Sequence, residues 1–357
     1  MQMSFGSIEM SQRIRKDSTL SKVNLFINWE ALRPQLTGLY KRESSHAGGQ
    51  EPFDSLVMFK AILLGQWHSL SDPKLEEALH VRIDFMQFCG LTMSDTVPDE
   101  TTLCRFRNRL IHANKFDQLL ASINAQLQQQ SLMIKAATGA VIDATLIESA
   151  ARPNKTITVE TDQDGQAITF DDGSSPGISC TEETSVDGDA AWVKKGKKSH
   201  YGYRSYVTVE ETEGYVCGVH TAPANESETT HFIPAIDKAH ITPTRVYADK
   251  GYASAKNRSH LRQGKIKSAI MHKGQRNKPL SKRQLKANKL ISRRRYIIEQ
   301  CFGTAKRLFG MARASYISTT KVNAQVIMKS ICMNLLKAAN KILISDVAKG
   351  VVRPQLG

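Results

Sequence analysis

The sequence lacks the features of membrane, secreted and zinc-stabilised proteins. It has no run of about 18 apolar residues, and its N-terminus has no apolar segment of the kind that directs secretion. The six cysteines are scattered, without a C-x-x-C pair and without histidines at zinc-finger spacing. We therefore expect a soluble protein of a reducing cytoplasm, with no membrane partner and no structural zinc.

Acidic residues are scarce in one long stretch. Between Ser254 and Arg313 there are eighteen Lys or Arg residues and one carboxylate, Glu299. The net charge is +1 over residues 1–135, −8 over 136–253 and +22 over 254–357. A basic region of this kind attracts a phosphate-rich partner such as nucleic acid, although ribosomal proteins share it. The one acid within it needs a chemical reason, and a metal ligand would supply one.

The first third of the chain has helical periodicity and few strand signals. Short polar connectors separate its apolar-periodic segments, which is typical of a compact helical domain. The predicted helices cover residues 54–67, 71–80, 84–89, 99–113 and 116–135.

From residue 138 onward the pattern predicts a mixed sheet with helices. The predicted strands are 138–149, a hairpin of 201–211 with 214–223, then 244–249 and 266–273. The predicted helices are 228–240, 253–263, 281–308 and 321–344. This order of elements is that of a ribonuclease H-like fold. Residues 156–193 contain nine acids and no Lys or Arg, and we interpret them as an acidic surface insertion.

These patterns predict an α/β protein in which a ribonuclease H-like mixed sheet flanked by helices follows an all-helical N-terminal domain. The expected units are a DNA-binding domain over 1–135, a catalytic domain over 136–313, and a C-terminal helix and tail over 314–357.

Two acids follow short apolar strands. Asp143 comes after the apolar residues 140–142, and Asp249 is the last residue of the predicted strand that begins at 244. A carboxylate buried there costs several kcal/mol unless it is paired or binds a metal. Each acid taken alone is also explained as a helix cap or a loop residue, so both alternatives stay open.

Glu299 lies on a predicted helix that carries basic companions. At about 100° per residue, Arg295, Glu299 and Lys306 fall on one face. An i,i+4 salt bridge worth about 0.3–0.5 kcal/mol would explain Arg295 and Glu299 alone. Three further basic residues crowd the same element: Arg293, Arg294 and Arg307. We interpret all five basic residues as DNA contacts.

Three converging carboxylates cannot all stay ionised without a cation, because like charges raise one another's pKa. Two Mg²⁺ ions held about 3.5 to 4 Å apart would resolve this and would clamp the attacking and leaving oxygens of a phosphoryl displacement. Oxygen ligands also favour Mg²⁺ or Mn²⁺ over zinc. Asp143, Asp249 and Glu299 are therefore candidate catalytic residues and metal ligands for cleavage or transfer of a phosphodiester.

The same residues resemble the three acidic motifs of bacterial insertion-sequence DDE transposases. The motifs are VIDATLI around Asp143, YADKGY around Asp249, and R-x3-E-x6-K from Arg295 to Lys306. The closest group is the one typified by insertion sequence 5, and the resemblance runs from about residue 52 to residue 309. One departure is that relatives often have Tyr three residues before the Arg of the third motif, where this chain has Ser292.

The resemblance implies what the protein does. A bacterial, nucleoid-associated transposase would bind the terminal inverted repeats of its element, and Asp143 and Asp249 would bind or bridge two metal ions. Glu299 would complete the shell of one ion, while Arg295 and Lys306 would hold phosphates beside the scissile bond. A freed 3′-hydroxyl would attack target DNA, with no ATP or other nucleotide cofactor. Because two element ends must be paired, a homodimer or higher oligomer on DNA is expected.

Sequence-specific binding is expected from the helix at 99–113. Leu103, Phe106 and Leu110 form one apolar face, and the opposite face is polar. A recognition helix has this pattern, and so does a helix with a solvated face. The candidate DNA contacts on it are Arg105, Asn108, Arg109 and His112. A second candidate group for phosphates is Lys194, Lys195, Lys197 and Lys198.

Three alternatives remain at this point. A ribonuclease H-like nuclease or resolvase would cleave DNA without strand transfer. A tyrosine recombinase would use one of the nine Tyr residues as nucleophile, without metal. A DNA-binding regulator with an inactive triad would keep its function after Asp143→Asn.

Overall fold

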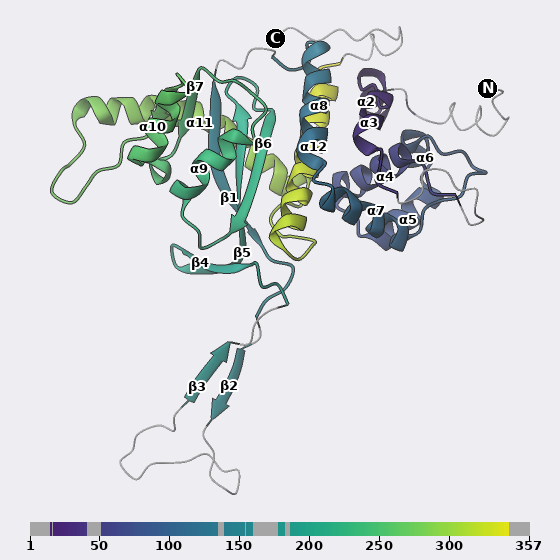
Figure 1. Ribbon diagram of the computed structural model, residues 1–357, viewed down its shortest axis with the longest axis horizontal. Coiled ribbons are helices and arrows are strands. Elements are labelled where there is room, and N and C mark those ends of the chain that lie inside the picture. The colour runs from purple at the N-terminus through teal and green to yellow at the C-terminus, as the bar shows by residue number, and fades with distance from the viewer. Residues whose placement is uncertain are drawn as a thin grey trace, which may run out of the picture.

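The computed structural model describes residues 15, 17–40, 51–134, 139–153, 155–159, 178–182 and 186–342. The chain builds a helical unit and a sheet unit, which lie on opposite sides of the long helix α12, Thr319–Asn340 (Figure 1). No helix within these ranges is both long and apolar enough to cross a bilayer.

The N-terminal unit consists of helices with side-chain caps. Asp54 and Asp99 accept hydrogen bonds from backbone N–H groups of the first helical turns that follow them. The elements are α2 Thr19–Phe26, η1 Glu30–Leu32, α3 Arg33–Leu36, α4 Ser55–Trp67, α5 Asp72–Val81, α6 Ile83–Cys89, α7 Glu100–His112 and α8 Phe116–Gln129. The five helices predicted from residue 54 onward are confirmed, except that the last ends at Gln129 and not at 135, because Ser131 takes a positive φ of 56°. The three elements before it were not predicted, because each is too short to show a clear period.

The second unit is a mixed sheet covered by helices, as the element order predicts. Its strands are β1 Ala140–Glu148, β4 Ala191–Lys195, β5 Lys198–Glu210, β6 Val216–Pro223, β7 Arg245–Ala248 and β8 Lys267–Ile270. The order is β4-β5-β1-β7-β8, and β6 pairs with a second stretch of β5. β1 is antiparallel to β5 and parallel to β7, and β8 is parallel to β7. The helical elements are α9 Glu228–Asp237, η2 Lys250–Tyr252, α10 Ala255–Gln263 and α11 Lys282–Leu308.

The acidic segment predicted as an insertion contributes to two sheets. β2, Lys155–Val159, and β3, Ile178–Glu182, pair as a separate hairpin that extends below the main sheet in Figure 1. Residues 191–193 at its other end belong to β4 of the main sheet. The rest of this segment lies largely outside the described residues.

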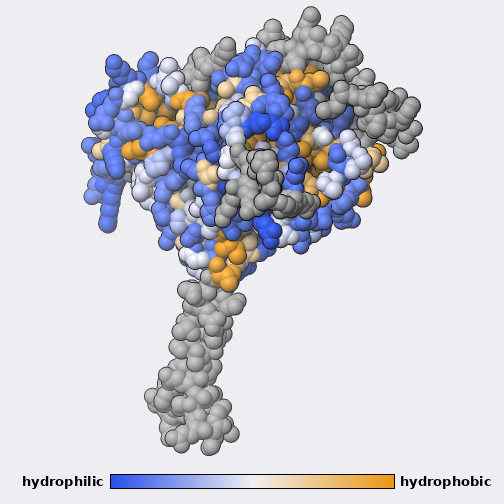
Figure 2. Space-filling view, turned by 45° about the vertical axis from the view of Figure 1, so that its right-hand side comes forward, coloured by the Kyte–Doolittle hydropathy of each residue, from blue (hydrophilic) through white to orange (hydrophobic). Residues whose placement is uncertain are grey.

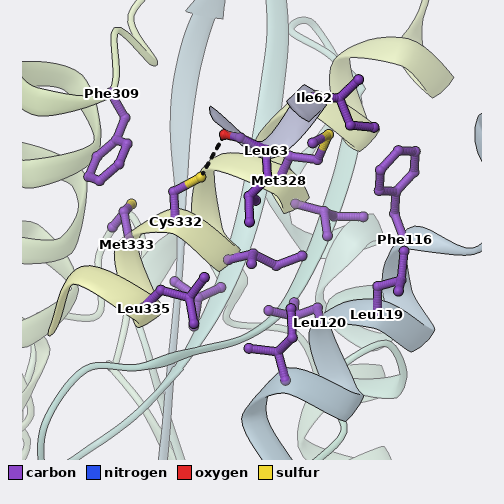
Figure 3. Close-up of a cluster of buried hydrophobic side chains, with 14 of the residues drawn as sticks. Ile62, Leu63, Phe116, Leu119, Leu120, Phe309, Met328, Cys332, Met333 and Leu335 are labelled. Carbon is purple, nitrogen blue, oxygen red and sulfur yellow. Dashed lines mark hydrogen bonds between the residues drawn. The ribbon is translucent and has the colours of Figure 1, made fainter. Parts of the chain in front are cut away.

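Helix α12 joins the two units through one continuous apolar core. It packs against α2, α4 and α8 on one side and against β6 on the other. Figure 3 shows Met328, Cys332 and Leu335 of α12 among side chains of the N-terminal helices, with the Cys332 thiol donating to the carbonyl of Leu63 at 3.6 Å. The buried cluster runs from Leu20 in α2 to Val219 in β6. The helical unit is therefore packed onto the sheet unit rather than tethered to it.

Candidate active site

Strand register places two of the predicted acids side by side. β1 and β7 are parallel, and Ile142 lies opposite Ala248. Asp143 directly follows Ile142, and Asp249 directly follows Ala248. Because neighbouring strands are about 4.8 Å apart, the two acids lie side by side. Asp143 is still within β1, where it pairs with Val207 of β5. Asp249 follows β7 at the start of η2, and its side chain caps no N–H group there.

Arg295 of α11 contacts both acids. Its Nη2 lies 2.5 Å from Asp143 Oδ2, and its Nη1 lies 3.6 Å from Asp249 Oδ1. The arginine is only 9% exposed, because this face of α11 packs on the sheet. Burial raises the pKa of Asp143, and the negative charge of Asp249 adds to the rise while Arg295 opposes it. Arg295 thus acts as the internal counter-ion of the two carboxylates.

Glu299 lies one helical turn beyond Arg295 and is exposed. The buried stripe of α11 runs through Ile298, Cys301 and Ala305, and Glu299 is at the edge of that stripe on the Arg295 side. No three His, Cys, Asp or Glu side chains lie close enough to hold a metal ion in the part of the chain that the structure describes. The structure thus brings Asp143 and Asp249 together, with Arg295 between them, and leaves Glu299 outside that group.

Two further residues at this site were missed by the sequence reasoning. Glu228 at the start of α9 binds Arg204, with Nη1 3.3 Å from Oε1. Burial raises the pKa of Glu228, and the charges of Asp143 and Asp249 raise it further. Tyr252, the last residue of η2, is fully buried, and burial followed by the charges of Asp143 and Glu228 raises its pKa well above 10. In the sequence Glu228 shows only as the first residue of a helix, and Tyr252 only as an aromatic residue near Asp249.

The side chains at the site fit a divalent metal ion of the oxygen-preferring kind. Asp143 and Asp249 supply carboxylate oxygens on adjacent strands, and a cationic side chain already occupies the space between them. Both acids offer oxygen only, which favours Mg²⁺ or Mn²⁺ over zinc, and the sulfur of Met271 accepts from Arg295 Nη1 at 3.8 Å.

The basic residues predicted on α11 differ in their placement. Arg293, Arg294 and Lys306 are exposed. Burial lowers the pKa of Lys306, and the charge of Lys195 lowers it further, so the β4–β5 hairpin reaches the same region as the end of α11. Arg307 lines a cavity of about 670 Å³ between α11 and α12, away from the acids.

The other predicted DNA contacts form two separate surfaces. Lys194, Lys195, Lys197 and Lys198 are all exposed at the tip of the β4–β5 hairpin. On α7, Arg105, Arg109 and His112 are exposed and Asn108 is partly so. Figure 1 places α7 on the far side of α12 from the sheet, so the two surfaces are well apart.

The apolar face of α7 is buried as predicted, since Leu103, Phe106 and Leu110 are at most 1% exposed. Arg107, which the sequence reasoning did not single out, is also buried and makes two hydrogen bonds to Asp72, of 2.6 and 2.7 Å. This arginine is therefore a structural residue of the helix.

Two family models match the chain. Residues 8–109 match the family described as Transposase domain (DUF772), and residues 135–335 match the one described as Transposase DDE domain. The chain belongs to the DDE transposases. It is 40% identical over 238 residues to the transposase for insertion sequence element IS1106 of Neisseria meningitidis serogroup B, covering 67% of this chain and 78% of that protein.

A solved structure of the piggyBac transposase synaptic complex with hairpin DNA also matches. It has a TM-score of 0.36 and 9% sequence identity, over 97% of this chain and 84% of that one. The family matches establish a bacterial insertion-sequence DDE transposase with a ribonuclease H-like fold. A DDE domain also implies dependence on a divalent metal ion and action on DNA.

Proposed function

We propose that this transposase binds the terminal inverted repeats of its own insertion sequence, cleaves the DNA at the element ends and joins the freed 3′-hydroxyl groups to target DNA. The adjacency of Asp143 and Asp249, set by strand register and bridged by Arg295, carries this proposal. Two adjacent carboxylates can bind the metal ions that phosphodiester cleavage requires, and the basic residues around them can hold the DNA phosphates.

In this proposal Asp143, Asp249 and Glu299 bind two Mg²⁺ or Mn²⁺ ions. When bound, the ions activate the attacking oxygen and stabilise the leaving one. Asp143 and Asp249 are already adjacent, whereas Glu299 joins them by reorientation of its exposed side chain. Arg295 leaves the two carboxylates and binds a phosphate beside the scissile bond, together with Lys306.

DNA is held by three basic surfaces. The polar face of α7, with Arg105, Asn108, Arg109 and His112, contacts the repeat. The β4–β5 hairpin tip, with Lys194, Lys195, Lys197 and Lys198, and the exposed α11 residues Arg293, Arg294 and Arg307 contact phosphates. Two copies of the chain pair the two element ends, so the active form is a dimer or higher oligomer on DNA.

The test is a cleavage and strand-transfer assay with DNA that carries the repeats of the element. We expect Mg²⁺-dependent cleavage and joining by the native protein. Asp143→Asn, Asp249→Asn or Glu299→Gln should abolish both and leave DNA binding intact, as measured by mobility shift. Undiminished cleavage by any of the three variants would overturn its assignment. Cleavage without joining would identify a nuclease or resolvase instead.

A further inference from the structure

Glu228 is a carboxylate of the site that belongs to none of the three acidic motifs. Its side chain is 30% exposed, and its only ion pair among the described residues is the single 3.3 Å contact of Oε1 with Arg204. The same Nη1 of Arg204 also donates a hydrogen bond to the carbonyl of Glu226 at 3.2 Å, so it is shared between two acceptors. The ion pair with Arg204 therefore accounts for Oε1 of Glu228 but not for the position of Oε2.

That second oxygen lies against the turn that follows Asp249. A Cβ atom on Gly251 would be 2.0 Å from Glu228 Oε2, so the carboxylate occupies the space that a side chain at position 251 would fill. Gly251 is two residues beyond Asp249, at the carboxyl end of β7. α9 contacts both η2 and β1, and the charges of Asp143 and Asp249 act on Glu228, although in the described structure the three carboxylates do not yet surround one common ion.

A buried donor at the same place has no partner. Tyr252 is 0% exposed, and its hydroxyl makes no hydrogen bond within the described part of the chain. It lies within electrostatic reach of Asp143 and Glu228. Nε of Arg295, also buried, is likewise without a partner among the described residues. A buried donor without a partner is costly, so both groups indicate a bound ligand that offers acceptor oxygens, such as a phosphate or the water of a hydrated ion.

The charge balance indicates a cation as well. Asp143, Asp249 and Glu228 carry three negative charges, and Arg295 and Arg204 carry two positive ones. The charge of Lys195 also acts on Glu228 and balances the remaining negative charge, so an excess appears when Arg295 moves to a phosphate. A divalent cation offsets this excess.

We propose that Glu228 is a further metal-binding carboxylate of this site, in addition to Asp143, Asp249 and Glu299. The inference rests on the proposed function, because it needs the two aspartates to bind metal. The competing explanation is that Glu228 only holds Arg204 and the start of α9.

The experiment measures Mn²⁺ binding to the full-length protein without DNA, by electron paramagnetic resonance and by calorimetry. Glu228→Gln removes the charge and keeps the shape of the side chain, and we expect it to raise the Kd for Mn²⁺ by about tenfold or more. Asp237→Asn is the matched control, because Asp237 is an exposed acid at the other end of α9 whose ion pair with His260 is 3.7 Å long. It should leave the Kd unchanged.

Asp143→Asn separates the two ways in which this can fail. If it abolishes Mn²⁺ binding while Glu228→Gln retains the native Kd, Glu228 is structural and the proposed function stands. If neither variant changes the Kd, the metal site itself is assigned wrongly. Thermal unfolding in EDTA shows whether Glu228→Gln folds. If it does not, Glu228→Asp replaces it, since Asp keeps the charge and withdraws the carboxylate; a native Kd in that variant also overturns the proposal.

Discussion

At the scale of single residues, Arg295 has two tasks that exclude each other. The third acidic motif predicts that it holds a phosphate, whereas in the structure without DNA it neutralises Asp143 and Asp249. Burial raises the pKa of Asp143 and the charge of Asp249 adds to the rise, while the buried cation of Arg295 opposes it. On the proposed function, the arginine therefore occupies the place that a metal ion would take and moves to a phosphate when DNA binds.

Replacing Arg295 should make the protein less stable without metal and more responsive to metal. Arg295→Gln should lower the free energy of unfolding in EDTA by about 2–3 kcal/mol, because it leaves two partly buried carboxylates facing each other. Added Mg²⁺ should then raise the Tm of the variant more than that of the native protein, since no side chain competes with the ion. Calorimetric scans with EDTA and with Mg²⁺ measure both effects.

The control for this prediction is Arg294→Gln. Arg294 is the preceding residue on α11 and is exposed, so its loss should change neither the stability nor the response to Mg²⁺. Equal Mg²⁺-induced shifts in the native protein and in Arg295→Gln would contradict the placeholder role.

The sequence singled out the aspartates of the acidic motifs as site residues, but it did not single out the residues that pack beside them. Asp143 and Asp249 stand out because each is an acid after an apolar strand, which is a local pattern. Glu228 and Tyr252 could not be found this way, since their proximity to the aspartates depends on how α9 and η2 pack on β1. The direction of Arg295 is likewise a result of tertiary packing, because the helix period predicts a shared face but not what that face meets.

At the scale of secondary-structure elements, α12 is the helix on which both units are built. It carries a buried polar junction: the Asn334 amide donates to Asn124 of α8 and to the carbonyl of Val216 in β6, each at 2.8 Å. Its oxygen accepts from the N–H of Val216 at 2.9 Å. The amphipathic pattern predicted this helix, but it did not predict that the helix would be packed on both sides.

Asn334→Ala should therefore destabilise the whole protein. It removes three buried hydrogen bonds and leaves polar groups of α8 and β6 unsatisfied, so we expect a loss of about 3 kcal/mol in the free energy of unfolding. Urea unfolding followed by circular dichroism measures it. Asn340→Ala, at the exposed end of the same helix, is the control and should have little effect. A change within about 0.5 kcal/mol for Asn334→Ala would mean that the junction is not structural.

At the scale of the whole molecule, charge is segregated along the chain and gathered in space. The +22 of the last third lies mainly on α10, on α11 and on the link between them, while the N-terminal unit is nearly neutral. Hydrophilic residues predominate on the described part of the face in Figure 2, interrupted by apolar patches. On the proposed function, general attraction to DNA therefore comes from the sheet unit, and we expect α7 to select sequence by local contacts.

This division predicts a specific salt dependence of DNA binding. Changing Lys194, Lys195, Lys197 and Lys198 to Gln should reduce the slope of log K against log salt by about 3 to 4, if each lysine neutralises one phosphate. Fluorescence anisotropy at several salt concentrations gives the slope. Lys74→Gln, on an exposed part of α5, should leave it unchanged. An unchanged slope in the hairpin variant would show that these lysines face solvent and do not contact DNA phosphates.

The overall architecture was predictable because it follows from local periods and from the order of elements. The mixed sheet and most helix positions follow from apolar runs and amphipathic stretches. The contact between the two units was not predictable, since the division expected at residue 313 treats α12 as a terminal addition. In the structure this helix lies between the two units and shares its core with both.

The contact between Gly251 and Glu228 has a consequence for how such elements diverge. Because Glu228 Oε2 fills the space of a side chain at position 251, a larger residue there would turn the carboxylate away from its present place. A copy that acquired alanine or a larger residue at 251 would therefore keep the fold while its Glu228 carboxylate points elsewhere. The direction of the Glu228 carboxylate thus depends on the absence of a side chain at a position 23 residues further along the chain.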